Sequence, residues 1–82
     1  MAEILYFGRM SDVTGMLSET VSLPDNVRTT SDIRLWAESR FKADGAFLEP
    51  TVRLAINSEI VTDPFPVNAG DEIAFMPPVG GG

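Results

Sequence analysis

The chain has 82 residues, of which 44% are hydrophobic and 22% charged, enough for one compact core and too few for a second domain. Twelve Asp and Glu against six Lys and Arg give a net charge of −6, which disfavours nucleic acid and anionic lipid surfaces and favours a protein partner with a basic face. Neither Cys nor His is present, which excludes thiol and imidazole catalysis, disulfides and the usual zinc ligand sets.

The N-terminal part of the sequence predicts a β-hairpin. Residues 4–7 form a short apolar run of strand-favouring types, which is typical of a strand buried on both faces. Residues 12–15 have the composition of a turn, and residues 16–23 resume with apolar side chains that share one face. We therefore expect the two apolar segments to pair as neighbouring strands.

A helix of about three turns is predicted to follow the hairpin. Residues 29–31 offer hydroxyl oxygens to the free amides of a helix start, and Asp32 places negative charge near the positive end of the helix dipole. Spacings of three and four place one stripe toward the core, comprising Ile33, Trp36, Ala37 and Phe41. The face expected to point to water carries Arg34, Glu38 and Lys42. Gly45 is expected to end the helix.

Three more strands are predicted in the C-terminal half. Residues 52–56 alternate large apolar residues with Arg53 and Ala55, a period-two pattern. A tight turn at residues 57–58 leads into a short strand at Ile60 and Val61, and residues 72–76 form the last strand.

The order of these elements predicts an α+β fold of the β-grasp, or ubiquitin-like, type. One main helix must cover one face of a mixed five-stranded sheet, because neither layer can bury its apolar side alone. The first and last strands then lie side by side at the centre. We expect residues 1–76 to form this domain and residues 77–82 to form an extended C-terminal tail.

No targeting or membrane segment is expected from the sequence. No apolar run approaches the ~20 residues that cross a bilayer, and no basic stretch precedes an apolar segment at the N-terminus. We therefore expect a soluble, cytoplasmic protein.

The last residues have the composition of a reactive tail, and they read Pro77, Pro78, Val79, Gly80, Gly81 and Gly82. The two prolines stop the strand and direct the chain outward, and six extended residues reach about 20 Å. Glycines fit a narrow channel and leave a terminal carbonyl open to attack. This pattern predicts a carrier whose terminal carboxylate, on Gly82, is activated by an external enzyme as a mixed anhydride with AMP and can then take up sulfur. A frayed terminus without function is the alternative.

The chain resembles the small, sulfur-carrying subunits of molybdopterin synthase. Residues 70–82 read GDEIAFMPPVGGG, similar to the family's ending GDEVAFFPPVxGG. Residues 55–61 resemble its AVNxxxV strand and turn, and residues 5–7 its opening aromatic strand. The chain departs from the pattern at Met76, where the family has a second aromatic residue, and at Gly80, where it has a variable, often hydroxyl-bearing residue.

The resemblance implies a function in molybdenum cofactor synthesis. An E1-like enzyme would use ATP to adenylate Gly82, and a desulfurase system would then supply sulfur to form a thiocarboxylate. The tail from Pro77 to Gly81 would enter the large, catalytic subunit, where sulfur passes to cyclic pyranopterin monophosphate and builds the dithiolene of molybdopterin. The family complex is a heterotetramer of two small and two large subunits. The chain itself would bind no cofactor or metal and would not be catalytic alone.

The root of the tail is also a candidate docking surface. We expect Phe7, Ile60 and Met76 to form an exposed apolar patch that docks on the large subunit or the activating enzyme, with ordinary packing as the alternative.

Three other functions stay open on the sequence. They are a sulfur carrier for thiamine, cysteine or tRNA thiolation, a covalent protein modifier joined through Gly82, and an interaction module with an incidental tail.

Overall fold

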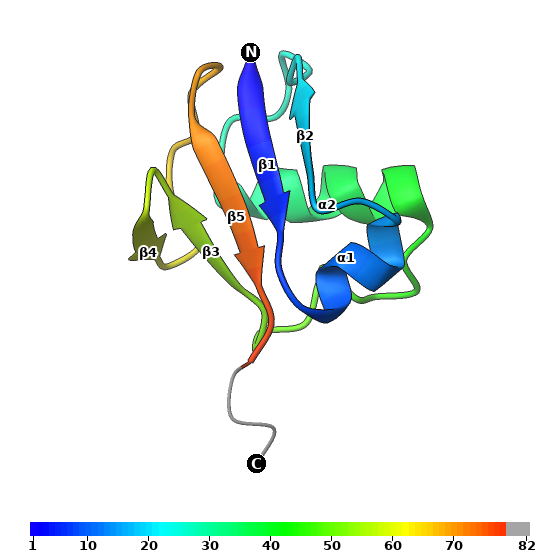
Figure 1. Cartoon of the computed structure of the whole chain (residues 1–82). Coiled ribbons are helices and arrows are strands. Elements are labelled where there is room, and N and C mark those ends of the chain that lie inside the picture. The colour runs from blue at the N-terminus through cyan, green and yellow to red at the C-terminus, as the bar shows by residue number, and fades with distance from the viewer. Residues whose placement is uncertain (79–82) are drawn as a thin grey trace.

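The computed structural model, which describes residues 1–78, contains one five-stranded sheet crossed on one face by a helix of 12 residues (Figure 1). The strands are β1 (Ala2–Tyr6), β2 (Ser18–Val21), β3 (Arg53–Ile56), β4 (Glu59–Val61) and β5 (Glu72–Met76). The helices are α1 (Arg9–Thr14) and α2 (Thr30–Phe41). The strand order is β2-β1-β5-β3-β4, so the predicted mixed sheet with one main helix is confirmed.

The first and last strands lie side by side at the centre of the sheet, as expected. β1 and β5 run parallel, with Ile4 opposite Ile73 and Tyr6 opposite Phe75. β2 pairs antiparallel with β1, and β3 pairs antiparallel with both β5 and β4. The predicted turn between β3 and β4 has positive φ at Asn57 (51°) and Ser58 (73°), as a tight hairpin turn of the primed type requires.

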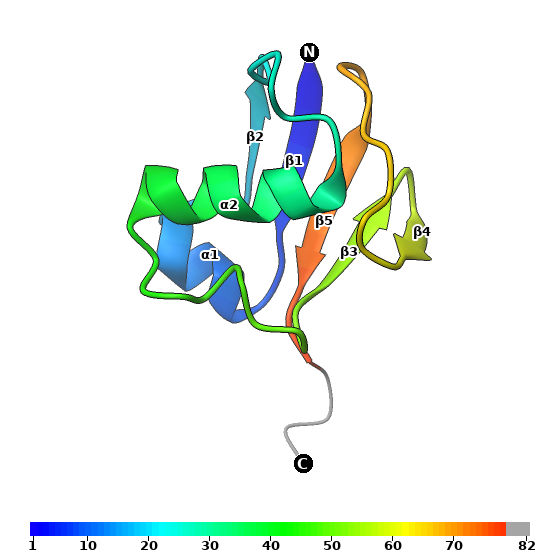
Figure 2. The same ribbon diagram turned by 180° about the vertical axis from the view of Figure 1, so that it is seen from behind.

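Only one face of the sheet is covered by α2 (Figure 2). In β1 the inward residues Ala2, Ile4 and Tyr6 are buried, whereas Leu5 is half-buried and Phe7, just after the strand, is 48% exposed. The prediction of a first strand buried on both faces is therefore wrong. A continuous apolar run is buried on both sides only where other elements cover both faces of the sheet. Within residues 1–78, no helix or second sheet covers the face opposite α2.

The short helix α1 occupies the region that the sequence assigned to a turn. The predicted turn at residues 12–15 is wrong, because Arg9–Thr14 is helical and Gly15 follows with a φ of 77°. Met10 is fully buried, and Val13 and Met16 pack against the core. Apolar burial therefore outweighs the local turn preference of Asp and Gly in this segment.

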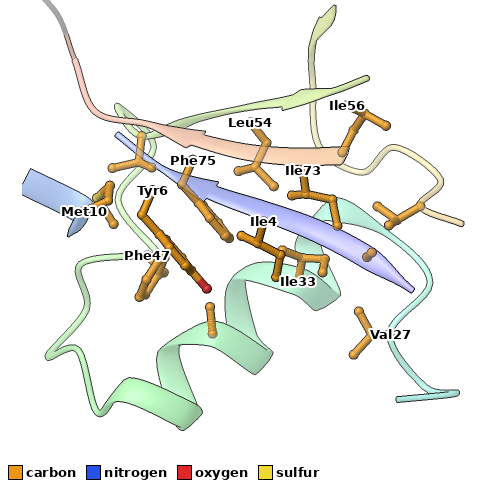
Figure 3. Packing of buried hydrophobic residues seen from close by; sticks show 14 residues of the cluster. Ile4, Tyr6, Met10, Val27, Ile33, Phe47, Leu54, Ile56, Ile73 and Phe75 are labelled. Atoms are coloured by element: carbon orange, nitrogen blue, oxygen red, sulfur yellow. The ribbon is translucent and has the colours of Figure 1, made fainter. Parts of the chain in front are cut away.

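The core lies between α2 and the covered face of the sheet (Figure 3). Its centre is aromatic: the Phe75 ring is 4.8 Å from that of Phe47 and is stacked 5.9 Å from that of Tyr6, measured between centroids. The predicted helical stripe is confirmed, with Ile33 and Ala37 fully buried and Trp36 and Phe41 partly buried against the core.

The start of α2 agrees with the sequence, but its end does not. Thr29 and Asp32 form a capping box in which each side chain accepts a hydrogen bond from the other's backbone N–H (3.3 and 3.1 Å). The helix ends at Phe41, before the predicted Gly45, and Lys42 caps it with a φ of 48°. Glu38, expected to point to water, accepts hydrogen bonds from the backbone N–H groups of Gly45 (2.6 Å) and Phe47 (3.1 Å).

Arg34 was also expected to point to water, and it does not. Its side chain is 12% exposed, and its guanidinium donates hydrogen bonds to the carbonyls of Phe47 (3.0 Å) and Val52 (2.6 Å) and to the Asp63 carboxylate (2.6 Å). The irregular segment before β3 has carbonyls that no strand partner satisfies, and a long cationic side chain supplies the donors. Arg34 thereby joins α2 to the chain on both sides of the β3–β4 hairpin.

Glu19 connects β2 to β1 and α2 through hydrogen bonds. It accepts one from the buried Tyr6 hydroxyl (2.6 Å) and two from the Arg40 guanidinium (2.8 and 3.0 Å). Its side chain is 14% exposed. The hydrogen bonds from Arg40 lower the pKa of Glu19 below its ordinary value of 4.5, although burial opposes this. Burial, with the bond to Glu19, raises the pKa of the Tyr6 hydroxyl.

We expect acid to weaken the fold through Glu19. Because its folded pKa lies below 4.5, its contribution is fully present above that pH and is lost as the pH falls through the folded pKa. Glu19→Gln should lower the free energy of unfolding at pH 7 by about 1–3 kcal/mol and should flatten its dependence on pH below 4.5. Urea unfolding at a series of pH values measures both effects.

Glu59→Gln, on the exposed strand β4, is the matched control and should change neither quantity appreciably. Some acid dependence should persist in Glu19→Gln, because the hydrogen bond from the Arg28 backbone N–H also lowers the pKa of Asp32. An acid dependence of Glu19→Gln identical to that of the wild type would contradict this assignment.

Candidate functional site

The root of the tail leaves the sheet at the end of β5 (Figure 1). The strand ends at Met76, as predicted, and Pro77 cannot continue the hydrogen-bond pattern because it lacks an N–H. The backbone N–H of Phe7 donates the last bond to the Phe75 carbonyl (3.1 Å). The predicted tail residues Val79, Gly80, Gly81 and Gly82 lie outside the described residues.

Gly8 lets the root of the tail approach the loop after β1. It has a φ of 53°, and a Cβ on it would lie 2.8 Å from Cγ of Pro77. A side chain would therefore be strained by the backbone and would also displace the proline ring. The contact places Pro77 directly beside the segment that carries Phe7.

The three predicted patch residues surround the root of the tail on the open face of the sheet. Phe7 is 48% exposed, Ile60 is 58% exposed and Met76 is half-buried. Phe7 and Met76 line one hollow together with Gly8, Pro77 and Pro78. Met76 and Ile60 line a second hollow, of about 540 Å³, together with Pro50, Thr51, Arg53, Pro77 and Pro78. The structure thus brings all three to one surface, which we call the tail-root patch; its role in docking stays a prediction.

Residues before and within β3 complete this surface, and the sequence did not identify them as part of it. Pro50, Thr51 and Arg53 form a wall of the second hollow, and Arg53 is opposite Met76 in the antiparallel register of β3 and β5. The alternation in residues 52–56 placed Arg53 on a polar face, but no local signal told which strand it would neighbour.

The described residues contain neither a metal-binding cluster nor a helix that could span a membrane. Within residues 1–78, no cluster of three acidic side chains could hold a metal ion. In the same range, neither α1 nor α2 is long and apolar enough to cross a bilayer. What the geometry offers is an exposed, largely apolar surface around the point from which the tail departs.

Comparison with known proteins places this geometry in a family. The ThiS family matches residues 4–82. The human (Homo sapiens) protein named molybdopterin synthase sulfur carrier subunit is 33% identical over 84 residues, covering 98% of this chain and 92% of that protein.

Solved structures share the fold. The crystal structure of SAMP1 from Haloferax volcanii has a TM-score of 0.79 at 24% identity, over 99% of this chain and 98% of that one. A putative molybdopterin converting factor, subunit 1, from Pyrococcus furiosus has a TM-score of 0.75 at 24% identity, over 95% and 97% of the two chains. Since the family match spans nearly the whole sequence, the chain belongs to the ThiS family, and its resemblance to molybdopterin synthase small subunits is confirmed.

Proposed function

We propose that this protein is the sulfur carrier of molybdopterin synthesis and that the Gly82 carboxyl group holds the sulfur. The observation that carries this proposal is the 33% identity to the human molybdopterin synthase sulfur carrier subunit over nearly the whole chain. The ending from Gly70 to Gly82, similar to that of the small subunits, supports it.

The chemistry starts from a group that is unreactive by itself. A carboxylate is a poor acyl donor because it is anionic and has no leaving group. An E1-like enzyme uses ATP to join it to AMP, releasing pyrophosphate. Hydrosulfide, released from the persulfide of a desulfurase by a reducing thiol that is oxidised to a disulfide, then attacks the carbonyl carbon of Gly82. The bond to the AMP oxygen breaks, AMP leaves with the electron pair, and a thiocarboxylate forms. In this scheme the chain binds no cofactor, and ATP belongs to the activating enzyme.

Delivery takes place in the large subunit. The tail-root patch of Phe7, Ile60 and Met76 docks, and the residues from Pro77 to Gly81 carry Gly82 into the active site. The thiocarboxylate sulfur attacks a side-chain carbon of cyclic pyranopterin monophosphate and displaces an oxygen substituent from that carbon. Water then hydrolyses the bond between the sulfur and the Gly82 carbonyl, which leaves the sulfur on the pterin and restores the carboxylate. Two sulfurs need two such cycles, in a complex of two small and two large subunits. The cytoplasmic location expected from the sequence stays a prediction.

Reconstitution tests the proposal. The purified chain, an activating enzyme, ATP, a sulfide source, the large subunit from the same organism and cyclic pyranopterin monophosphate should together form molybdopterin, and omission of this chain should stop its formation. A small subunit of known activity serves as the positive control. Failure of the chain to form molybdopterin, in a mixture where the control succeeds, would contradict the proposal.

A covalent protein modifier and a carrier for another pathway are the competing functions. The likeness to SAMP1, at 24% identity, concerns the fold and does not favour either. The two chemistries separate by mass: a thiocarboxylate adds about 16 Da to the free chain, whereas a modifier is found in larger conjugates that disappear when Gly82 is removed. A carrier for another pathway would be distinguished by the molecule that accepts its sulfur, which would not be cyclic pyranopterin monophosphate.

Phe7→Ala should weaken complex formation much more than it weakens the fold. Because the ring is 48% exposed, we expect a loss of less than about 1 kcal/mol in unfolding free energy and an affinity for the large subunit reduced about 10-fold or more. Calorimetric titration and urea unfolding measure the two quantities. Phe65→Ala, which truncates another ring that is 37% exposed, is the control. Unchanged affinity of Phe7→Ala would contradict the assigned role.

A further inference from the structure

An isolated positive charge lies beside the root of the tail in a chain whose net charge is −6. Arg53 is exposed, begins β3 and faces Met76 across the ladder. Its side chain borders two hollows. One is shared with Ile60, Met76, Thr51 and three prolines, which are Pro50, Pro77 and Pro78. The other is shared with Arg34, Leu48, Pro50, Val61, Thr62 and Asp63.

Arg53 differs from three of the other four arginines, each of which has a carboxylate partner, while Arg28 donates to the backbone carbonyl of Asp25 (3.2 Å). Arg9 pairs with Glu49 (2.6 Å), Arg34 with Asp63 (2.6 Å), and Arg40 with Glu19 (2.8 Å). No carboxylate within residues 1–78 lies at ion-pair distance from Arg53. Asp63 borders the same hollow, but its carboxylate already accepts from the largely buried Arg34.

A partner that covers this surface must accommodate the Arg53 guanidinium. Apolar contacts with Ile60 and Met76 would bring partner atoms over it and remove its water, and a desolvated charge without an acceptor is strongly unfavourable. A guanidinium presents several N–H donors in a planar fork that matches a carboxylate in a bidentate arrangement. Arginine within an apolar contact surface is also a frequent site of high binding energy.

We propose that Arg53 determines partner specificity by binding an Asp or Glu carboxylate on the surface of the large subunit that covers the tail-root patch. This inference rests on the proposed function, because it assigns the chemistry of one contact in that complex. It also opposes the expectation from net charge, since an acidic chain taken as a whole favours a basic partner surface.

Charge reversal separates the local contact from the overall charge. Arg53→Glu and Lys42→Glu each change the net charge by the same amount, but Lys42 caps α2, on the covered side of the sheet. Calorimetric titration of the full-length chain with the large subunit should show affinity reduced about 10-fold or more for Arg53→Glu and changed less than about threefold for Lys42→Glu. Arg53→Ala should lie between the wild type and Arg53→Glu, and Arg53→Lys should keep part of the affinity.

The dependence of binding on salt and its rescue by a second substitution distinguish loss of this contact from a general loss of structure. The difference in affinity for the large subunit between the wild type and Arg53→Glu should shrink as ionic strength rises. Urea unfolding should show that these two proteins have equal stability. An Asp→Lys or Glu→Lys substitution on the large-subunit surface should restore binding of Arg53→Glu. Equal or tighter binding of Arg53→Glu than of Lys42→Glu would overturn the role of Arg53 while leaving the proposed function intact. If the wild type neither binds the large subunit nor supports molybdopterin formation, both fall.

Discussion

Removal of Gly81 and Gly82 should reduce sulfur delivery to the background rate and leave the domain folded. The two residues account for about 7 Å of extended chain, so the carboxyl group of the shortened tail would stop well short of the position that the enzymes require. Misplacement of a reacting group by about 1 Å can lower a rate about 100-fold, and we expect a loss of about 1,000-fold or more here. Molybdopterin formation in the reconstituted mixture measures the rate.

A second variant separates length from shape. Gly82→Val keeps the length of the tail and its carboxylate, but it adds a branched side chain next to the reacting carbonyl. Sulfur delivery and activation by the proposed E1-like enzyme should both fall, because a channel that fits glycine would not admit the branched side chain. Leu17→Ala is the control for effects of substitution that do not involve the tail. It truncates a side chain that is 77% exposed on the loop before β2.

Stability should be unaffected by these changes in the tail. The last strand ends at Met76 and the core residue nearest the tail is Phe75, so the urea midpoints of the shortened and wild-type chains should agree. A shortened chain that delivers sulfur at the wild-type rate would contradict the assignment of Gly82.

Phe75→Ala should remove most of the stability of the domain. Phe75 is fully buried in the central strand β5 and contacts the rings of Tyr6 and Phe47. Truncation of such a ring lowers the free energy of unfolding by about 3–5 kcal/mol, against a total of about 5–10 kcal/mol for a small domain. Urea unfolding followed by far-UV circular dichroism measures the loss.

Phe7→Ala is the matched control for this effect, because it makes the same substitution at the end of the neighbouring strand on the open face. Phe7 is 48% exposed, so its removal should change stability by less than about 1 kcal/mol. The two variants should therefore differ in what they lose. Phe75→Ala should lose stability, whereas Phe7→Ala should lose affinity for the large subunit. A loss of less than about 1 kcal/mol in Phe75→Ala would contradict the packing described.

Features with a local physical cause could be predicted from the sequence. The start of α2 follows from the hydroxyl groups of residues 29–31 and the negative charge of Asp32, and in the structure the side chains of Thr29 and Asp32 cap each other's backbone N–H. The hairpin turn at residues 57–58 follows from the same kind of local preference. The pairing of β1 with β5 is a long-range feature, but one helix can cover the sheet in few ways, and the order of elements predicted it.

Features created by distant contacts could not be predicted in this way. Helical spacing assigned Arg34 and Glu38 to water, whereas both bind backbone groups of the irregular segment before β3. Nothing local indicates that this segment returns to α2. For the same reason α1 was missed, because burial of Met10 depends on the core and not on its neighbours in the sequence.

The candidate site likewise has a part that could be predicted from the sequence and a part that could not. Alternation in the first and last strands was enough to expect Phe7 and Met76 on one surface. The position of Arg53 beside Met76 depends on the register between β3 and β5, which a single sequence does not reveal. The apolar part of the tail-root patch was therefore predicted, and its charge was not.

The mass of the native C-terminus, in protein isolated from cells that are making molybdopterin, tests whether Gly82 carries the sulfur. We expect a form that is heavier by about 16 Da than the unmodified chain, with fragmentation placing the added mass on Gly82, and we expect this form to vanish in cells that lack the activating enzyme. Undiminished molybdopterin synthesis in cells where every copy of the chain has an unmodified or blocked terminus would contradict this function.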